Sequence, residues 1–356
     1  MRASRGPAWT VFLALGSLMA IVGATALLLL IAGYDVPRAL GALWTGSVGS
    51  WYALTSATLV RAIPLMLTGC AIAVAFRAGV WNIGAEGQLL AGGAGATGVA
   101  LLVPGAGTIA IVLSLATGAA AGGVWAGIAA GLRARFGVLE VISTIMLNFV
   151  ALYAVSFLVR GPLQEPTHAY PQSSSLADAV HLARIPGAGR LHAGIALAVV
   201  IVLAAGWVMR HTAAGYRLMA VGESPAAAAS AGMIDVRRVT TLAFITSGAL
   251  AGLAGAIEVL GVTFALYEDL SPGYGYTAIA VALLAGLDPW RVIGTSLLFA
   301  ALEAGAGAMQ RDAGVPSTLV SVIEAFLILG VVAAQALRAR RASVVTGGEL
   351  NRESAA

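Results

Sequence analysis

The sequence predicts an all-α, polytopic membrane protein of about ten transmembrane helices. Its mean hydropathy is +0.92, while 59% of the 356 residues are hydrophobic and only 10% are charged. This composition excludes an ordinary soluble globular domain. The 45 glycines suit transmembrane helices, because small residues let helix backbones approach each other closely.

Ten apolar runs approach or fall somewhat below the ~20 residues that a helix needs to cross a bilayer. The first is too long for the core of a cleavable signal peptide, so we expect an uncleaved span. The eighth is short, and the flanking Gly273 and Asp288-Pro289 indicate a broken or half-inserted segment. The expected spans are 9–33, 52–76, 80–103, 107–132, 138–160, 193–209, 239–261, 275–288, 291–310 and 317–337.

The arginines predict the orientation, since cytoplasmic loops of membrane proteins carry an excess of positive charge. With a cytoplasmic N-terminus, most of the 20 basic residues fall on the cytoplasmic side, including Arg77, Arg133, Arg210 and Arg237. Both termini are therefore expected in the cytoplasm. The polar tail 338–356 is expected to be disordered.

Two connecting loops are unusually long. Residues 161–192, expected outside, are rich in Pro, Ser and Gly, and either contact an external partner or form a solvated connector. Residues 210–238, expected inside, contain Ser224 as a helix N-cap, Pro225 in the first turn and an alanine run. They predict a short cytoplasmic helix, although the arginines around it could serve only as membrane anchors.

Polar side chains interrupt the apolar sequence in residues 76–93, FRAGVWNIGAEGQLLAGG. Such groups are costly at membrane depth and tend to face a bundle interior or a water-filled path. They predict a substrate lining, with an ordinary cytoplasmic loop as the alternative. A related Gly-rich segment occurs at 273–287, GYGYTAIAVALLAGL. Spans two to five and seven to ten thus suggest an inverted repeat, the arrangement in which transporters bind substrates at the repeat interface.

Enzymatic activity is not expected from this chain. It contains no lysine, so a GxxxxGK[ST] phosphate loop is excluded, and any ATP that drives the protein must bind another chain. Ser247 has no intramembrane histidine to activate it. There is no HExxH motif and no metal-ligand spacing, so we expect neither catalytic nor metal-binding residues.

Four ordered segments resemble the membrane permeases of ABC importers. They are the 76–93 segment, STIMLNFVALYAVSFLVRGPLQEP at 143–166, AVGESPAAAASAGM at 220–233 and GYGYTAIAVALLAG at 273–286. The resemblance covers about residues 9–337 and lies in the branch for branched-chain amino acids, ribose and nucleosides. NIGAEGQ and TIMLN look most like the nucleoside or "simple sugar" subgroup. A ribose-type sugar permease is the alternative, although the GIDLSVG-like motif of that group is missing. An ion-coupled secondary transporter would favour acids clustered at mid-membrane, whereas this chain scatters them near span ends.

The resemblance implies one transmembrane permease domain over residues 1–337 in a bacterial plasma membrane. Its partners would be cytoplasmic ATPase subunits that bind ATP and Mg²⁺, a second permease that is identical or homologous, and an external solute-binding lipoprotein; no nucleic acid is expected. Residues 222–233 would be the coupling helix that docks into the ATPase. The residues that this assigns to the coupling helix are Gly222, Glu223, Ser224, Pro225, Ala226, Ala227, Ala231 and Gly232.

The substrate path is expected to use uncharged hydrogen-bonding groups and aromatic faces, which suit the hydroxyls and ring of a nucleoside or sugar. Tyrosines could instead be interfacial belt residues. Glu86 either accepts hydrogen bonds from the substrate or pairs with Arg77 or Trp81 at the inner face, in a structural or gating role. The predicted path residues are Asn82, Glu86, Gln88, Thr144, Asn148, Tyr274, Tyr276 and Thr277.

Overall fold

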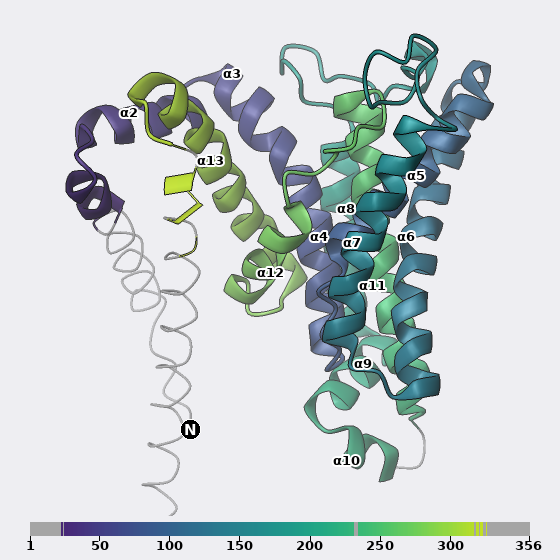
Figure 1. Ribbon diagram of the computed structural model, residues 1–356. Helices are drawn as coiled ribbons and strands as arrows, with labels where there is room; N and C mark the ends of the chain where they lie inside the picture. The colour runs from purple at the N-terminus through teal and green to yellow at the C-terminus, as the bar shows by residue number, and fades with distance from the viewer. Residues whose placement is uncertain are drawn as a thin grey trace, which may run out of the picture. The chain divides into compact units, whose positions relative to one another are not determined.

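The computed structural model describes residues 23, 25–230, 234–316, 318, 319, 321, 322 and 325, and within them the regular structure is helical (Figure 1). Three isolated β-bridges lie in loops. The predicted tail 338–356 and the coupling residues Ala231 and Gly232 lie outside the described residues, as does most of the predicted spans 9–33 and 317–337. The all-α prediction is confirmed for the described part of the chain.

Six of the described helical segments are long and apolar enough to cross a membrane, so the predicted number of about ten is not confirmed. Two of the expected spans correspond to helices that are too polar or too short to be counted among these six. Helix α5 (Ala85–Leu102) is diluted by glycines and by Glu86 and Gln88, and α12 (Tyr274–Leu284) has only 11 residues. The six segments are Trp51–Arg77, Thr108–Phe136, Glu140–Arg160, Gly194–His211, Val236–Thr263 and Pro289–Ala313.

The chain forms two compact units. One comprises residues 1–49 and 302–356, and its described core joins α2 (Val36–Ser47) to the last part of α13 (Pro289–Ala313). The core residues include Ala39, Ala42 and Met309. The other unit, residues 50–301, contains the candidate site.

In the larger unit, α4 (Leu59–Arg77), α5 and α11 (Val236–Glu258) supply the buried centre. Helices α6 (Thr108–Phe136), α7 (Glu140–Arg160) and α8 (Gly194–His211) surround it. These outer helices expose large apolar side chains such as Val124, Phe157 and Trp207. Exposed apolar surface of this kind suits lipid contact, because lipid tails are as apolar as the side chains that face them.

Glycines allow α5, α6 and α11 to pack backbone against backbone. A Cβ atom on Gly92 would lie 2.1 Å from the carbonyl oxygen of Gly252, and one on Gly252 would lie 2.3 Å from that of Gly118. A Cβ on Gly255 would lie 2.0 Å from the carbonyl oxygen of Leu89. No larger residue fits at these positions without separating the helices, so this glycine seam fixes how α5 sits on α11.

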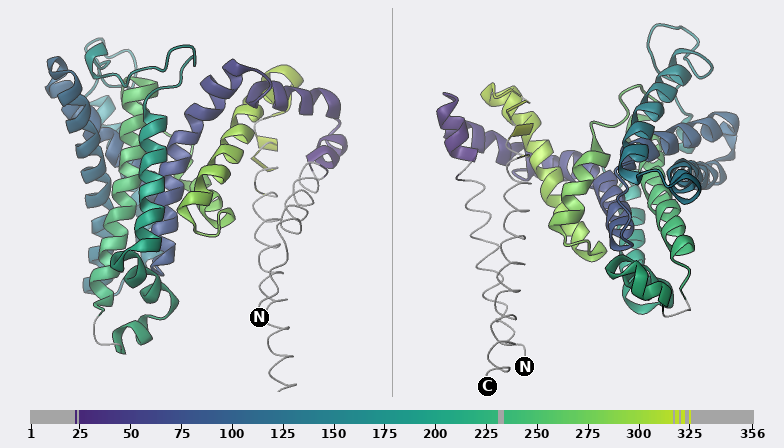
Figure 2. Two further views of the ribbon diagram at one scale, coloured as in Figure 1. Left: turned by 180° about the vertical axis from the view of Figure 1, so that it is seen from behind. Right: turned by 60° about the horizontal axis from the view of Figure 1, so that its bottom comes forward.

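The two ends of the larger unit differ. One end carries the loop 161–192, and the opposite end carries α9 (Ala213–Glu223) and α10 (Pro225–Ser230) (Figures 1 and 2). At the loop end, α11 continues into a π-turn, Val259–Thr263. The loop is attached there, because the N–H of Leu182 donates to the carbonyl of Leu260 and the N–H of Leu176 to that of Phe264.

Candidate functional site: a buried amide cluster and a short helix

Asn82 is at the centre of a buried polar cluster. Residues 78–84 leave the helical path between α4 and α5, and this break turns the Asn82 side chain into the bundle. Its amide exchanges two 2.9 Å hydrogen bonds with the Gln88 side chain and donates a third, also 2.9 Å, to Ser247 Oγ of α11. Asn82 Oδ1 also accepts from the N–H of Gly84. The break is thus held by side chains where backbone helix bonds are missing.

Two residues of α7 bind the same break from the other side. Asn148 Oδ1 accepts a 2.8 Å hydrogen bond from the N–H of Gly87, and its Nδ2 donates to the carbonyl of Ile83. Thr144 Oγ1 accepts from the N–H of Ile83. Gly87 is necessary for this approach, since a Cβ there would lie 2.9 Å from Asn148 Cα. The structure therefore brings Asn82, Gln88, Thr144 and Asn148 together, each buried.

Glu86 lies at the N-terminus of α12. Its carboxylate accepts a 2.7 Å hydrogen bond from the N–H of Gly275 and another from the Ser271 side chain. Negative charge and acceptor oxygens are favourable at a helix N-terminus, where backbone N–H groups lack partners. A Cβ on Gly275 would lie 2.2 Å from Glu86 N. These contacts agree with the structural role expected for Glu86, but its partners are Gly275 and Ser271 and not Arg77 or Trp81.

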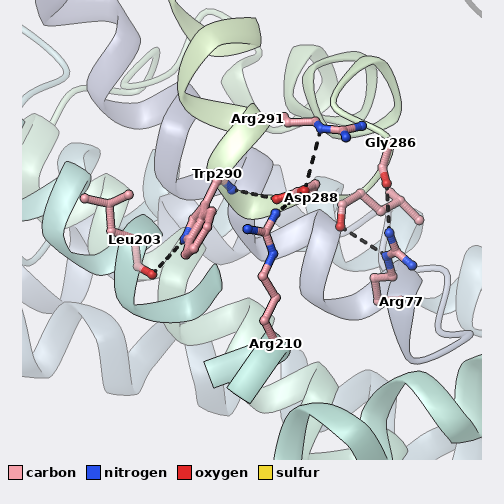
Figure 3. Close-up of polar contacts among 8 residues, drawn as sticks. Arg77, Leu203, Arg210, Gly286, Asp288, Trp290 and Arg291 are labelled. Atoms are coloured by element: carbon pink, nitrogen blue, oxygen red, sulfur yellow. Dashed lines mark hydrogen bonds and ion pairs between the residues drawn. The ribbon is translucent and has the colours of Figure 1, made fainter. Parts of the chain in front are cut away.

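Arg77 binds the opposite end of α12. Its guanidinium donates to the carbonyls of Gly286 (3.1 Å) and Leu287 (3.2 Å), as Figure 3 shows for Gly286. Both residues have positive φ, 64° and 57°, which ends the helix in left-handed backbone. A cation at a helix C-terminus satisfies free carbonyls and opposes the helix dipole. The segment 76–93 therefore holds α12 at both ends.

The predicted aromatic residues of α12 differ in accessibility. Tyr274 is buried, whereas Tyr276 is 46% exposed and its hydroxyl lies 3.4 Å from Asn148 Nδ2. Thr277 is half-buried. The hydroxyl of Tyr276 thus connects the buried amide cluster to an accessible aromatic face, the arrangement expected of a group that contacts a ligand with both a ring and hydroxyls.

The segment between α11 and α12 is hydrogen-bonded to the end of α7 and to the loop 161–192. Glu268 accepts hydrogen bonds from Ser156 Oγ (2.7 Å) and Arg160 Nη2 (2.6 Å) at the end of α7. These two bonds hold the pKa of the Glu268 carboxyl below its ordinary value of 4.5. Ser173 of the loop exchanges two hydrogen bonds with the backbone of Leu266. Loop 161–192 is thus joined to the approach to α12.

The predicted coupling segment begins as a helix where the sequence indicated. Helix α10 starts at Pro225, and Ser224 Oγ accepts from the N–H of Ala227. Glu223, Ala226 and Ala227 are exposed at this end of the bundle. Gly222 instead faces inward, since a Cβ on it would lie 1.9 Å from the carbonyl oxygen of Arg77.

Sequence reasoning missed several residues that complete the site. The sequence suggested Ser247 only as a nucleophile, and Arg77 only as a cytoplasmic charge or a partner of Glu86. Ser271 lies in a Gly- and Pro-containing segment, where a helix-capping serine has a recognisable pattern. The small residues that follow Ser247 indicate a close contact between helices, but they do not indicate that Asn82 is its hydrogen-bond partner.

Comparisons with known proteins place this chain in a family. The family model described as "Branched-chain amino acid transport system / permease component" matches residues 54–332. The guanosine ABC transporter permease protein NupP of Bacillus subtilis is 39% identical, over 89% of this chain and 91% of its own length. The glucose ABC transporter permease protein TsgB13 of Haloferax volcanii is 37% identical, over 91% and 87%.

A third relative is the nucleoside ABC transporter permease protein NupB of Lactococcus lactis, 30% identical over 85% of each chain. No solved structure matches this chain. The family model covers most of the chain, and these relatives align along most of their lengths, so the resemblance is not confined to a single motif. The chain belongs to the family of permease components of branched-chain amino acid-type transport systems, whose members are transport subunits of ABC transporters and not enzymes.

Proposed function

We propose that this permease carries a nucleoside across the membrane as the transmembrane subunit of an ABC importer. The observation that carries the proposal is the 39% identity, along almost the whole chain, to a permease named for guanosine. The relative named for nucleosides supports the same substrate class. A sugar such as glucose is the second candidate, because the permease named for glucose is 37% identical.

The chemistry of the candidate site agrees with an uncharged, hydroxyl-bearing substrate. Tyr276 lies next to the cluster, is 46% exposed as a residue, and offers both a hydroxyl and a ring suited to stacking. The charged groups Glu86 and Arg77 are already engaged with the two ends of α12. We therefore infer that Tyr276 and Thr277 contact the substrate and that Asn82, Gln88, Thr144 and Asn148 hold the wall behind them.

ATP and Mg²⁺ would be bound by partner ATPase subunits, since the absence of lysine excludes a phosphate loop here. Residues 222–233 would dock into those subunits, because α10 is short, exposed and placed at one end of the bundle. The α10 end would then be cytoplasmic, with both termini on that side of a bacterial plasma membrane. The loop 161–192 would face an external solute-binding lipoprotein, and a second permease, identical or homologous, would complete the importer.

The proposed inverted repeat, within a bundle of about ten spans, is supported by reciprocal packing. Helix α4 begins the first proposed unit and packs on α12 of the second, while α11 begins the second unit and packs on α5 of the first. Such an exchange is expected of two related units whose second helices break at the substrate site. The short length of α12, 11 residues, fits this arrangement.

The proposal is tested by uptake of radiolabelled guanosine, other nucleosides, ribose and glucose in cells with and without this gene. We expect loss of nucleoside uptake in the deletion strain and its restoration by the intact gene. Selective loss of sugar uptake would transfer the assignment to sugars. Restoration by a chain with Glu223→Arg, present at normal level in the membrane, would contradict ATPase docking at α10 and favour an ion-coupled secondary transporter.

Substrate contact by Tyr276 is tested separately with Tyr276→Phe and Tyr276→Ala. The phenylalanine variant keeps the ring and loses the hydroxyl, so nucleoside affinity should fall modestly, whereas the alanine variant should lose most of it. Equal uptake constants in both variants and the parent would remove Tyr276 from the substrate path.

A further inference from the structure

The turn that follows α12 is fixed by arginines from two different helices. Arg77, at the end of α4, binds the carbonyls of Gly286 and Leu287. Arg210, at the end of α8, forms an ion pair with Asp288 in the same turn. Figure 3 shows both arginines directed at this turn from the neighbouring helices. We refer to residues 285–288 as the α12 turn.

Aromatic packing reinforces the Arg210 contact. The Arg210 guanidinium lies 3.7 Å from the centre of the Trp290 ring, and the Trp290 indole N–H donates a 3.1 Å hydrogen bond to the carbonyl of Leu203 in α8. Asp288 Oδ1 in turn accepts from the N–H of Trp290. A stacked, ion-paired guanidinium holds its geometry better than a solvated surface pair does. The α12 turn is thus joined firmly to the end of α8.

Both arginines are also connected to the α9–α10 segment. Arg210 is followed by His211 and Thr212, after which α9 begins at Ala213. Arg77 is connected through space, because Gly222 at the end of α9 packs against the carbonyl oxygen of Arg77. Gly79 faces the same point, and a Cβ there would lie 3.4 Å from Gly222 Cα. The α9–α10 segment is therefore linked to the α12 turn through both Arg77 and Arg210.

We propose that Arg77 and Arg210 are positioning residues that make α12 follow the α9–α10 segment, so that its movement changes the position of Tyr276 and Thr277. The inference rests on the proposed docking of an ATPase at α10. Helix α12 is suited to this role because its 11 residues can move as one rigid body of about 16 Å. Both of its ends are bound by charged side chains, Glu86 at one and Arg77 at the other, so a shift of either partner acts directly on the helix.

The test uses the permease purified together with its ATPase subunits. Cys70 is the sole cysteine in the sequence and is buried, so Thr277→Cys introduces a second thiol at a half-buried position of α12, where its reactivity reports on exposure. Its rate of reaction with a maleimide is measured without nucleotide and with trapped ATP. We expect the two rates to differ, and Arg77→Gln or Arg210→Gln to reduce that difference by about tenfold, within the range of ordinary coupling energies.

Arg291→Gln is the matched control. Arg291 lies beside the same turn, but its side chain is 75% exposed. Its Nε is 3.7 Å from Asp288 Oδ2, which is longer than a hydrogen bond. Its removal changes the local charge by the same amount and should leave the difference in rate intact. Arg77→Lys keeps the charge but not the fork that spans two carbonyls, so it should give an intermediate difference even if Arg77→Gln does not fold.

Two results would overturn the inference. One is a nucleotide-dependent rate at Thr277→Cys that persists in both Arg77→Gln and Arg210→Gln. The other is an unchanged rate in the chain that carries Thr277→Cys alone. Neither depends on which solute is carried, so a wrong substrate would leave the result interpretable. Failure of any ATPase to copurify would instead contradict the proposed function.

Discussion

Helices α5 and α12 occupy matching places in the two proposed repeats, but they are held in different ways. Helix α5 is fixed along its length by glycines that bring its backbone against that of α11. Helix α12 also packs on α4, but each of its ends is bound by a charged side chain, Glu86 at one and Arg77 at the other. From this difference we infer that α5 is the more rigid wall of the candidate site and α12 the more adjustable one.

The largest effect should come from filling the glycine seam. Gly92→Ala places a Cβ 2.1 Å from the carbonyl oxygen of Gly252, so α5 and α11 must separate. We expect a loss of about 3 kcal/mol in the free energy of unfolding, toward the upper end of overpacking effects. Gly98→Ala in the same helix has open space and should be neutral. Unfolding in mixed micelles measures both, and equal stabilities would refute the rigid-wall account.

Removing the centre of the amide cluster should have the next largest effect. Asn82→Ala removes the hydrogen-bond partner of Gln88, Ser247 and the N–H of Gly84, all of which are buried. Stranding buried polar groups costs about 1–3 kcal/mol. Ser247→Ala removes one of those bonds and should cost less in the same unfolding measurement. A larger loss in Ser247→Ala would show that Asn82 is not central.

Cutting the attachment at the N-terminus of α12 should cost less stability but affect transport more. Glu86→Ala removes the acceptor for Gly275 and Ser271, with an expected loss of about 1 kcal/mol, as for a helix N-cap. Uptake should fall more sharply than stability, because α12 loses its position. Glu86→Gln keeps an acceptor oxygen and should recover part of the uptake. Equal uptake by the two variants would contradict a capping role.

The smallest effect is a pH dependence at the loop end. The Glu268 carboxyl has a lowered pKa because of its bonds to Ser156 and Arg160. Its contribution to stability is therefore present above its ordinary pKa of 4.5 and is lost as the pH falls through the lower pKa of the folded protein. The thermal midpoint should fall slightly more below pH 4.5 in the parent than in Glu268→Gln. Parallel curves would refute this.

The helical architecture and most residues of the candidate site could be predicted from the sequence. Apolar runs predicted the segment Trp51–Arg77, which ends with α4, and helices α6, α7, α8, α11 and α13 to within a few residues, because membrane length constrains such helices strongly. It overestimated the spans near α5 and α12, where polar residues and glycines break the helical path. The amides Asn82, Gln88 and Asn148 stood out because they are costly in an apolar chain.

The partners of the charged residues were beyond sequence reasoning. Glu86 binds the backbone N–H of Gly275, and Arg77 binds two carbonyls, and a backbone group has no signature in the sequence. The contact between Gly222 and Arg77 joins residues 145 positions apart, so it follows only from the packing of α9 on α4. Local patterns reveal which groups need partners, while the fold determines which partners they find.

The most direct test of a fixed α5 beside an adjustable α12 is a pair of spin-label distances in the purified complex. One pair joins Leu102 of α5 to Val124 of α6, both exposed, and the other joins Tyr276 of α12 to the same Val124. The account predicts that trapping ATP changes the distance from Tyr276 and leaves the distance from Leu102 unchanged. A change in the Leu102 distance with a constant Tyr276 distance would contradict it.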